Sequence, residues 1–136
     1  MSTAGYSGTP LITKLGLRAG MSVTMLKAPK SLSDLLGELP EGIAVSRRLA
    51  GRADVVLIFV QRAAELAAKV VALKNAIAPN GMVWVAWPKR ASTVPTDLTE
   101  NVIREIVLPT GLVDVKVCAI DETWSGLKLV VRKELR

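Results

Sequence analysis

The sequence predicts an α/β fold, a three-layer sandwich in which helices cover both faces of a mainly parallel, Rossmann-like sheet with a C-terminal antiparallel hairpin. Residues 53–60 (ADVVLIFV) are apolar almost throughout, which is typical of a parallel strand buried on both faces. Apolar strand patterns then alternate with helical patterns until two strand patterns follow each other near the C-terminus. Half of the residues are hydrophobic and only 4% are aromatic, so Val, Leu, Ile and Ala must build the core.

Before the central strand, the sequence predicts four short elements: a helix over 9–16, a strand over 21–26, a helix over 32–39 and a strand over 42–45. In the first helix, Thr9 is the expected N-cap, Pro10 suits the first helical position and Gly16 can end the helix. The length is that of one ordinary domain. We therefore expect a single domain over residues 1–136, with residues 1–17 as an N-terminal segment that packs on it.

After the central strand, the predicted elements are a helix over 61–78, a PNG turn at 79–81, a strand over 82–87, a helix that starts at Asp97, and two strands over 112–120 and 127–133. Asp97 and Glu100 have the spacing of a capping box, and Leu98, Val102 and Ile106 are expected on the inner face of that helix. The last two strands are joined by DETWSG at 121–126. Because this connection is short, the strands should pair antiparallel.

Composition excludes several chemistries. The chain has no histidine and a single cysteine, Cys118, so it offers no internal disulfide, no histidine acid/base catalysis and no Cys/His metal site. Eighteen basic and 12 acidic residues give a net charge of +6, which favours anionic partners. The basic residues are scattered, so nucleic-acid binding is only weakly supported. No secretory signal and no membrane-spanning apolar run is recognised, so a cytoplasmic protein without membrane contact is expected.

Four segments together resemble the S-adenosylmethionine-dependent methyltransferase fold: LGLRAGMSVTML at 15–26, ADVVLIFV at 53–60, LKNAIAPNGMVWVAW at 73–87 and TGLVDVKV at 110–117. The resemblance implies a methyltransferase-like sheet and S-adenosylmethionine as the cofactor. In that family a glycine-rich loop follows the first strand and an acidic residue ends the second. This chain has KAPK at 27–30 and Arg47 and Arg48 at these places, which disfavours that cofactor. The sequence therefore predicts no cofactor.

Five further motifs resemble an uncharacterised bacterial family of small domains of unknown function: YSGTPL at 6–11, LPEG at 39–42, WPK at 87–89, TDLTE at 96–100 and TWSGLKLV at 123–130. This resemblance extends over nearly the whole chain. It implies a compact domain and brings no catalytic or binding residues with it.

Three loops are candidate ligand sites, because ligands of open parallel sheets bind beyond the carboxyl ends of the strands. The candidate ligand-binding residues are Lys27 and Lys30 in the first loop, Trp87, Lys89, Arg90, Ser92 and Thr93 in the second, and Asp121 and Trp124 in the third. The lysines and the arginine could bind an anion, and the hydroxyls could donate hydrogen bonds. The competing interpretation is structural: solvated charges, turn-forming residues and helix caps. No catalytic residue and no metal ligand is predicted.

The leading hypothesis is a non-enzymatic binding or regulatory module, derived from a methyltransferase-like fold, whose partner is an anionic small molecule or another protein. The absence of histidine, of a glycine-rich loop and of a nucleophile–base pair supports it. Two alternatives stay open. One is a methyltransferase relative that binds S-adenosylmethionine in a nonstandard way, with Lys27, Asp121 and the 87–97 loop as its first candidates. The other is a weak nucleic-acid binder, and a homodimer is also left open.

Overall fold

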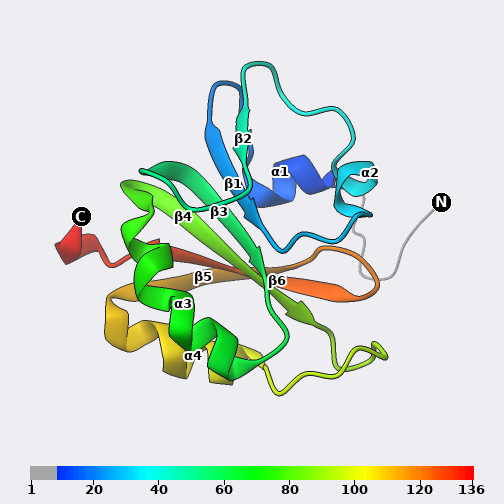
Figure 1. Cartoon of the computed structure of the whole chain (residues 1–136), viewed down its shortest axis with the longest axis vertical. Coiled ribbons are helices and arrows are strands. Elements are labelled where there is room, and N and C mark those ends of the chain that lie inside the picture. Colours follow the sequence, from blue (N-terminus) through cyan, green and yellow to red (C-terminus); the bar gives the residue numbers. More distant parts are fainter. Residues whose placement is uncertain (1–8) are drawn as a thin grey trace.

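A six-stranded sheet with helices on both faces forms the molecule (Figure 1). The computed structural model describes residues 9–136. The strands are β1 (Ser22–Leu26), β2 (Ala44–Ser46), β3 (Ala53–Phe59), β4 (Ile77–Pro88), β5 (Leu112–Ala119) and β6 (Trp124–Val131). Their order is β2-β1-β3-β4-β6-β5, in which β1 to β4 are parallel and β6 runs antiparallel to both of its neighbours. The predicted fold class is thereby confirmed.

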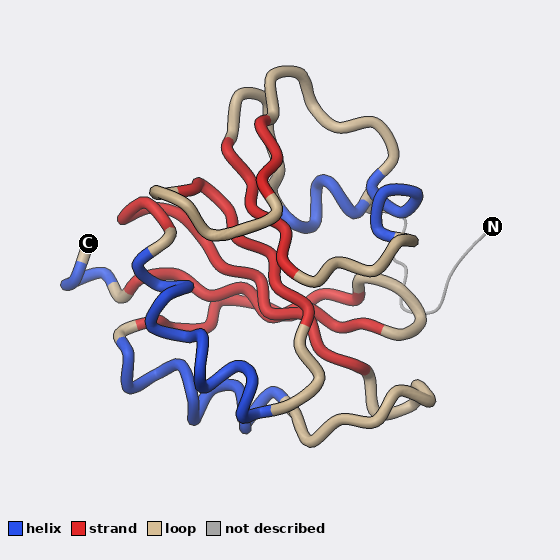
Figure 2. The backbone as a smooth tube through the Cα atoms, in the orientation of Figure 1, coloured by secondary structure: helices blue, strands red, loops and turns tan. Residues whose placement is uncertain are grey.

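Two pairs of helices make the outer layers, as the tube in Figure 2 shows. The helices are α1 (Leu11–Leu15), α2 (Leu32–Leu36), α3 (Ala63–Asn75) and α4 (Glu100–Val107), with 3-10 turns at η1 (Leu108–Thr110) and η2 (Lys133–Leu135). The apolar sides of α3 and α4 pack in one core cluster with alternate residues of β3, β4 and β6. The helices α1 and α2 pack in a second cluster on the opposite face. None of the helices within residues 9–136 is long and apolar enough to cross a bilayer.

The centre of the sheet is apolar on both faces, as parallel strands between helices require. Residues 55–59 of β3 and the following Val60 are at most 3% exposed. Trp84 of β4 is fully buried, and its indole Nε1 donates a hydrogen bond to the carbonyl oxygen of Leu15 at 2.9 Å. This bond satisfies a buried donor and ties the end of α1 to the sheet. The segment around α1 therefore packs on the sheet, while residues 1–8 of the expected N-terminal segment lie outside the described residues.

The start of β4 differs from the sequence prediction. The helix α3 ends at Asn75, and β4 already begins at Ile77, so the PNG segment lies within the strand. The register between β3 and β4 shifts between Ala53 and Val55, which indicates a bulge. At Gly81 an added Cβ would lie 2.9 Å from the backbone oxygen of Asp54. Glycine is required there by the close approach of two strands, and not by a turn that ends a helix.

Three further boundaries correct the predictions. The helix α1 has Pro10, and not Thr9, at its N-cap position, although Gly16 ends it as expected with φ 77°. The strand β6 begins at Trp124, inside the segment that was predicted to be a connection. The helix α4 is capped by Thr99, whose Oγ1 accepts a hydrogen bond from the N–H of Val102 at 3.1 Å. Its most buried residues are Ile103 and Val107, whereas the predicted inner-face residues Val102 and Ile106 pack at the margin of the core and Leu98 is buried before the helix.

Candidate functional site

The carboxyl ends of β1, β2, β3 and β4 meet at one edge of the sheet, and the loop after β4 is the longest connection there (Figure 1). This loop is held at both ends. The N–H of Lys89 donates to the carbonyl oxygen of Thr123 at 2.7 Å, which fixes the loop to the turn before β6. Farther along, the hydroxyl of Thr96 donates to the carbonyl oxygen of Gln61 at 2.6 Å. The loop is therefore a fixed part of the carboxyl edge.

Asp97 provides a third anchor, and its role differs from the prediction. Its Oδ1 accepts a hydrogen bond from the backbone N–H of Ala63 at 2.8 Å. Ala63 is the first residue of α3, and the preceding Arg62 makes no side-chain cap. Asp97 thus caps α3 across the sheet edge, and not its own helix α4.

An open cleft of about 640 Å³ lies beside the anchored loop. It is lined by loop residues between Lys89 and Glu100, together with Trp87 at the end of β4 and Ser125 of β6. Trp87 is only 7% exposed, so its indole forms part of the cleft wall and makes little contact with solvent. The volume is in the range that proteins use for small-molecule ligands.

Two cations and two carboxylates line the cleft, and they differ in whether they have partners within the fold. Lys89 and Arg90 line it, and neither forms an ion pair with a described residue. Two acidic residues, Asp97 and Glu100, also line it, but both have partners within the fold. Asp97 caps α3, and the Oε2 atom of Glu100 accepts a hydrogen bond from Arg104 at 2.6 Å. Both carboxylates keep their negative charge, so an anion would have to bind on the Lys89 and Arg90 side of the cleft, where the two cations are unpaired.

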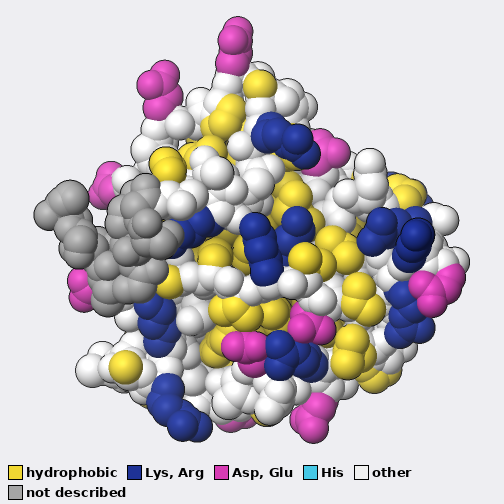
Figure 3. Space-filling model, turned by 180° about the vertical axis from the view of Figure 1, so that it is seen from behind, with side chains coloured by type: hydrophobic (Ala, Val, Ile, Leu, Met, Phe, Trp, Pro, Cys, Tyr) yellow, Lys and Arg dark blue, Asp and Glu magenta, His cyan; other side chains and the backbone are white. Residues whose placement is uncertain are grey.

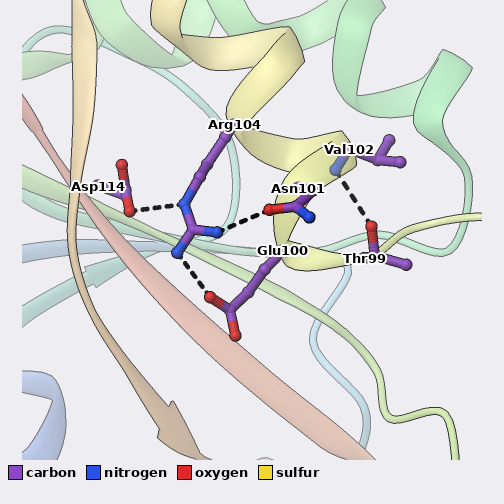
Figure 4. A network of polar contacts seen from close by, with 6 residues as sticks. All are labelled: Thr99, Glu100, Asn101, Val102, Arg104 and Asp114. Atoms are coloured by element: carbon purple, nitrogen blue, oxygen red, sulfur yellow. Dashed lines mark hydrogen bonds and ion pairs between the residues drawn. The ribbon is translucent and has the colours of Figure 1, made fainter.

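The arginine that engages Glu100 is the centre of a small network (Figure 4). Arg104 of α4 also donates from Nε to Oδ2 of Asp114 on β5 at 2.8 Å and from Nη1 to Oδ1 of Asn101 at 3.0 Å. The hydrogen bond from Arg104 lowers the pKa of Asp114. The network fixes α4 to the edge strand β5 and keeps Glu100 turned toward its own helix.

The hydroxyl groups of the loop divide into two kinds. Ser92 donates from Oγ to the carbonyl oxygen of Lys89 at 2.8 Å and accepts from the N–H of Val94 at 3.4 Å, so it shapes the turn after β4. Thr93 is exposed, and its hydroxyl forms no hydrogen bond with another described residue, so it is available to a ligand. Of the five residues predicted here, all line the cleft, but Ser92 is also a structural residue.

Asp121 and Trp124 lie next to this loop and are engaged in the fold. The backbone N–H groups of Thr123 and Trp124 each donate a hydrogen bond to Oδ1 of Asp121 at 2.8 Å, so the carboxylate stabilises the turn before β6. The ring of Trp124 packs edge-on against Phe59, with centroids 5.0 Å apart and an interplanar angle of 86°. Neither side chain lines the cleft. From this segment only Ser125 does, and the sequence analysis did not single it out.

Lys27 and Lys30 are not brought into the cleft. Lys27 forms an ion pair with Glu65 of α3, which joins the end of β1 to the helix after β3. Burial raises the pKa of Glu65, but the hydrogen bonds from Lys27 and from the Gln61 N–H, with the nearby lysine charges, lower it more, and the net pKa lies below the ordinary value. Lys30 lines a separate cavity over α2.

The turn after β1 is where the methyltransferase resemblance would place S-adenosylmethionine, and its residues do not fit that cofactor. Lys27 has φ 58°, a left-handed backbone conformation that usually belongs to glycine. Its side chain extends across to Glu65, and Pro29 follows. After β2, Arg47 stands where an acidic residue would bind ribose hydroxyls. A side chain, a proline ring and a cation therefore replace the groups that would contact the cofactor.

Other candidate chemistries have little support in the described chain. From residue 9 to residue 136, no three Asp, Glu or Cys side chains are arranged to hold a metal ion. Burial raises the pKa of the Cys118 thiol, which makes it less reactive than a free thiol.

The hydroxyl of Ser22 donates a hydrogen bond to the carboxylate of Asp54 at 3.4 Å, and the same carboxylate accepts a hydrogen bond from the Ser22 N–H at 2.9 Å. This pair joins the starts of β1 and β3, far along the strands from the cleft.

The sheet order, the two helix layers and the C-terminal hairpin define a methyltransferase-like α/β domain. A SAM-dependent methyltransferase from Aquifex aeolicus is 13% identical with a TM-score of 0.62, over 89% of this chain and 88% of that one. The DhpI–SAH complex is 12% identical with a TM-score of 0.62, over 91% and 83%. Fibrillarin from Aeropyrum pernix, with natively bound S-adenosyl-L-methionine, is 14% identical with a TM-score of 0.58, over 93% and 70%. At these identities the similarity shows the fold alone.

The chain itself belongs to the family described as "Protein of unknown function (DUF3052)", which matches residues 14–133. The resemblance to an uncharacterised family is thereby confirmed, as is the more distant one to the methyltransferase fold. A search of the curated proteins finds no match to the sequence.

Proposed function

We propose that this domain is a non-enzymatic binding module that holds a small anionic ligand in the cleft beside the loop after β4. The proposal rests on which charged groups of the cleft have partners. Lys89 and Arg90 form no ion pair with a described residue, whereas one oxygen of each carboxylate in the same cleft accepts a hydrogen bond within the fold. The three anchors of the loop support it, because a preorganised loop loses little entropy when it binds.

The second candidate function, a methyltransferase relative, has the fold in its favour and the turn after β1 against it. Proteins of this fold include some whose structures contain S-adenosyl-L-methionine or SAH. In this chain the ion pair of Lys27 with Glu65 lies across the same region. We expect binding of the cofactor at this turn to compete with that ion pair.

Nucleic-acid binding is a third candidate with less support. On the face shown in Figure 3, Lys and Arg side chains are dispersed among apolar and acidic ones and form no continuous band. A dispersed arrangement neutralises few adjacent phosphates. Binding of DNA or RNA through this face would therefore be weak and would disappear as salt is added.

A titration with pyrophosphate, ATP, S-adenosylmethionine and a short DNA duplex tests these functions together. Binding is followed by isothermal calorimetry and by the shift in melting temperature. We expect ATP or pyrophosphate to bind and stabilise the protein, and Lys89→Ala and Arg90→Ala each to weaken that binding roughly threefold to tenfold. Arg48→Ala removes one charge outside the cleft and serves as the matched control.

The outcomes separate the candidates. Binding of S-adenosylmethionine with no response to the anions would overturn the proposal in favour of the methyltransferase relative. DNA binding that vanishes at high salt and is weakened equally by Arg48→Ala and Arg90→Ala would favour the nucleic-acid binder. Binding of the anions that is unchanged in Lys89→Ala and Arg90→Ala would place the site away from this cleft.

A further inference from the structure

A second cavity, of about 430 Å³, lies on the other side of the carboxyl edge, where the turn after β1, the helix α2 and the strand β2 meet. Short elements leave this space open. The helix α2 has five residues, and β2 has three and forms the edge of the sheet. Val45 of β2 is consequently 42% exposed, although its paired neighbour Val23 is buried.

The walls of this cavity are mainly apolar. Buried Met25, Leu32 and Leu36 contribute, with the half-buried Leu39 and the exposed Val45. Burial of the apolar surface that stays open here would favour the binding of an apolar group.

Two cations stand at the same cavity. Lys30 and Arg47 line it, no acidic residue does, and neither cation forms an ion pair with a described residue. The cavity therefore combines an apolar wall with two positive charges and no negative one. A second copy of this chain would not complement it through the same surface, because cations would then face cations.

We propose that this cavity binds a small amphiphilic anion: a molecule with an apolar body that packs on Met25, Leu36 and Val45 and one anionic group that Lys30 and Arg47 hold. Its volume suits a single small ligand. The cavity shares no lining residue with the cleft beside Lys89 and Arg90, so the two sites are independent.

The test compares octanoate with octylammonium and acetate, which vary the charge and the apolar body separately. The readouts are calorimetry and the NMR signals of methionine methyl groups. Met25 lies in the cavity wall, whereas Met82 lies outside it near Gly16 and serves as an internal control. We expect octanoate to bind and to shift the Met25 signal, with octylammonium and acetate binding at least roughly tenfold more weakly.

Variants assign the two halves of the ligand. Lys30→Ala and Arg47→Ala should each weaken octanoate binding roughly threefold to tenfold. Val45→Glu puts a carboxylate on the apolar wall at an exposed position that tolerates it, and should abolish binding. Arg48→Ala is the matched control, and the double variant Lys89→Ala/Arg90→Ala should bind octanoate as the unaltered protein does.

Three results would overturn the proposal: octylammonium that binds as tightly as octanoate, octanoate binding that Lys30→Ala and Arg47→Ala leave unchanged, or a shift of Met82 with none of Met25. Loss of octanoate binding in Lys89→Ala/Arg90→Ala would also overturn it and would assign the anion to the cleft of the proposed function. Failure of the cleft to bind ATP or pyrophosphate leaves this prediction unaffected, since the variants and probes differ.

Discussion

The carboxylate of Asp97 caps a helix that begins 34 residues earlier in the chain, by accepting the N–H of Ala63 at 2.8 Å. A cap normally comes from the residue just before its helix. Here Arg62 occupies that position and makes no side-chain cap, so the loop after β4 supplies the missing acceptor. The same hydrogen bond completes the N-terminus of α3 and fixes the loop that lines the cleft.

Replacing Asp97 by Ala should therefore have two effects. The free energy of unfolding should fall by about 1 kcal/mol, because an N–H at the start of α3 loses its acceptor. Binding of the anionic probe at the cleft should be weaker in Asp97→Ala than in Asp97→Asn, because both variants lose the carboxylate charge and only Asp97→Ala loses the anchor of the loop. Urea unfolding measures the first effect and calorimetry with pyrophosphate the second.

Two controls separate these effects. Asp97→Asn keeps an oxygen acceptor and should retain most of the stability. Thr99→Ala removes the local cap of α4 and should cost a similar free energy of about 1 kcal/mol, but it should leave the loop anchored to α3. Equal loss of affinity in Asp97→Ala and Thr99→Ala would contradict a specific role of Asp97 in the cleft.

The ion pair of Arg104 with Asp114 makes a contribution to stability that depends on pH. The hydrogen bond from Arg104 lowers the pKa of Asp114 in the folded protein. The unfolded chain consequently binds the proton of the Asp114 carboxyl more tightly than the folded chain does. The contribution of the ion pair to stability is therefore complete above the unfolded pKa of about 3.9, and it is lost as the pH falls through the lowered pKa of the folded protein. Arg104→Gln should thus be less stable than the unaltered protein near neutral pH.

That difference in stability should shrink as the pH falls below about 4. Urea unfolding of both proteins across the acidic range measures it. Asp114→Asn is the matched variant: it removes the titrating group and should flatten the same part of the pH profile. A difference between Arg104→Gln and the unaltered protein that stays constant down to the lowest pH would show that the ion pair does not cause it.

Lys116 on β5 and Lys128 on β6 are directly paired across the strands, where like charges are unfavourable. Burial lowers the pKa of Lys128, and the positive charges of Lys116 and Arg18 lower it further. Lys116→Glu should therefore stabilise the protein, by about 0.5 kcal/mol at low salt. Lys116→Gln should give a smaller gain, and the gain of both should shrink at high salt. Destabilisation by Lys116→Glu, measured by thermal melting, would contradict the repulsion.

Local patterns were enough to predict the fold class and most of the elements. The strand β3 is predictable because burial on both faces leaves one continuous apolar run. The bulge before Gly81 is not, since it depends on the approach of the Asp54 carbonyl from a neighbouring strand. The start of β6 was missed for a related reason: Trp124 has turn residues beside it, but it pairs with Pro88 across the sheet.

The candidate site was predictable in position more than in detail. The carboxyl edge follows from the parallel strands, and the loop residues that line the cleft lie consecutively in the sequence. The engagement of Asp97 and Glu100 depends on partners that only the folded chain brings near. Arg47 was noted only as a departure from the methyltransferase pattern, because its apolar neighbours in the cavity come from three separate segments.

The backbone of Lys27 has φ 58°, which costs an L-amino acid free energy that glycine does not lose. Lys27→Ala and Lys27→Gly both remove the ion pair with Glu65, so their difference measures the backbone alone. We expect Lys27→Gly to be more stable than Lys27→Ala by about 0.5–1 kcal/mol in urea unfolding. At Lys30, which lacks a positive φ, the order should reverse, because glycine there only adds entropy to the unfolded chain. The same order at both positions would show that the turn after β1 relaxes when the lysine is replaced, and that the ion pair holds its conformation.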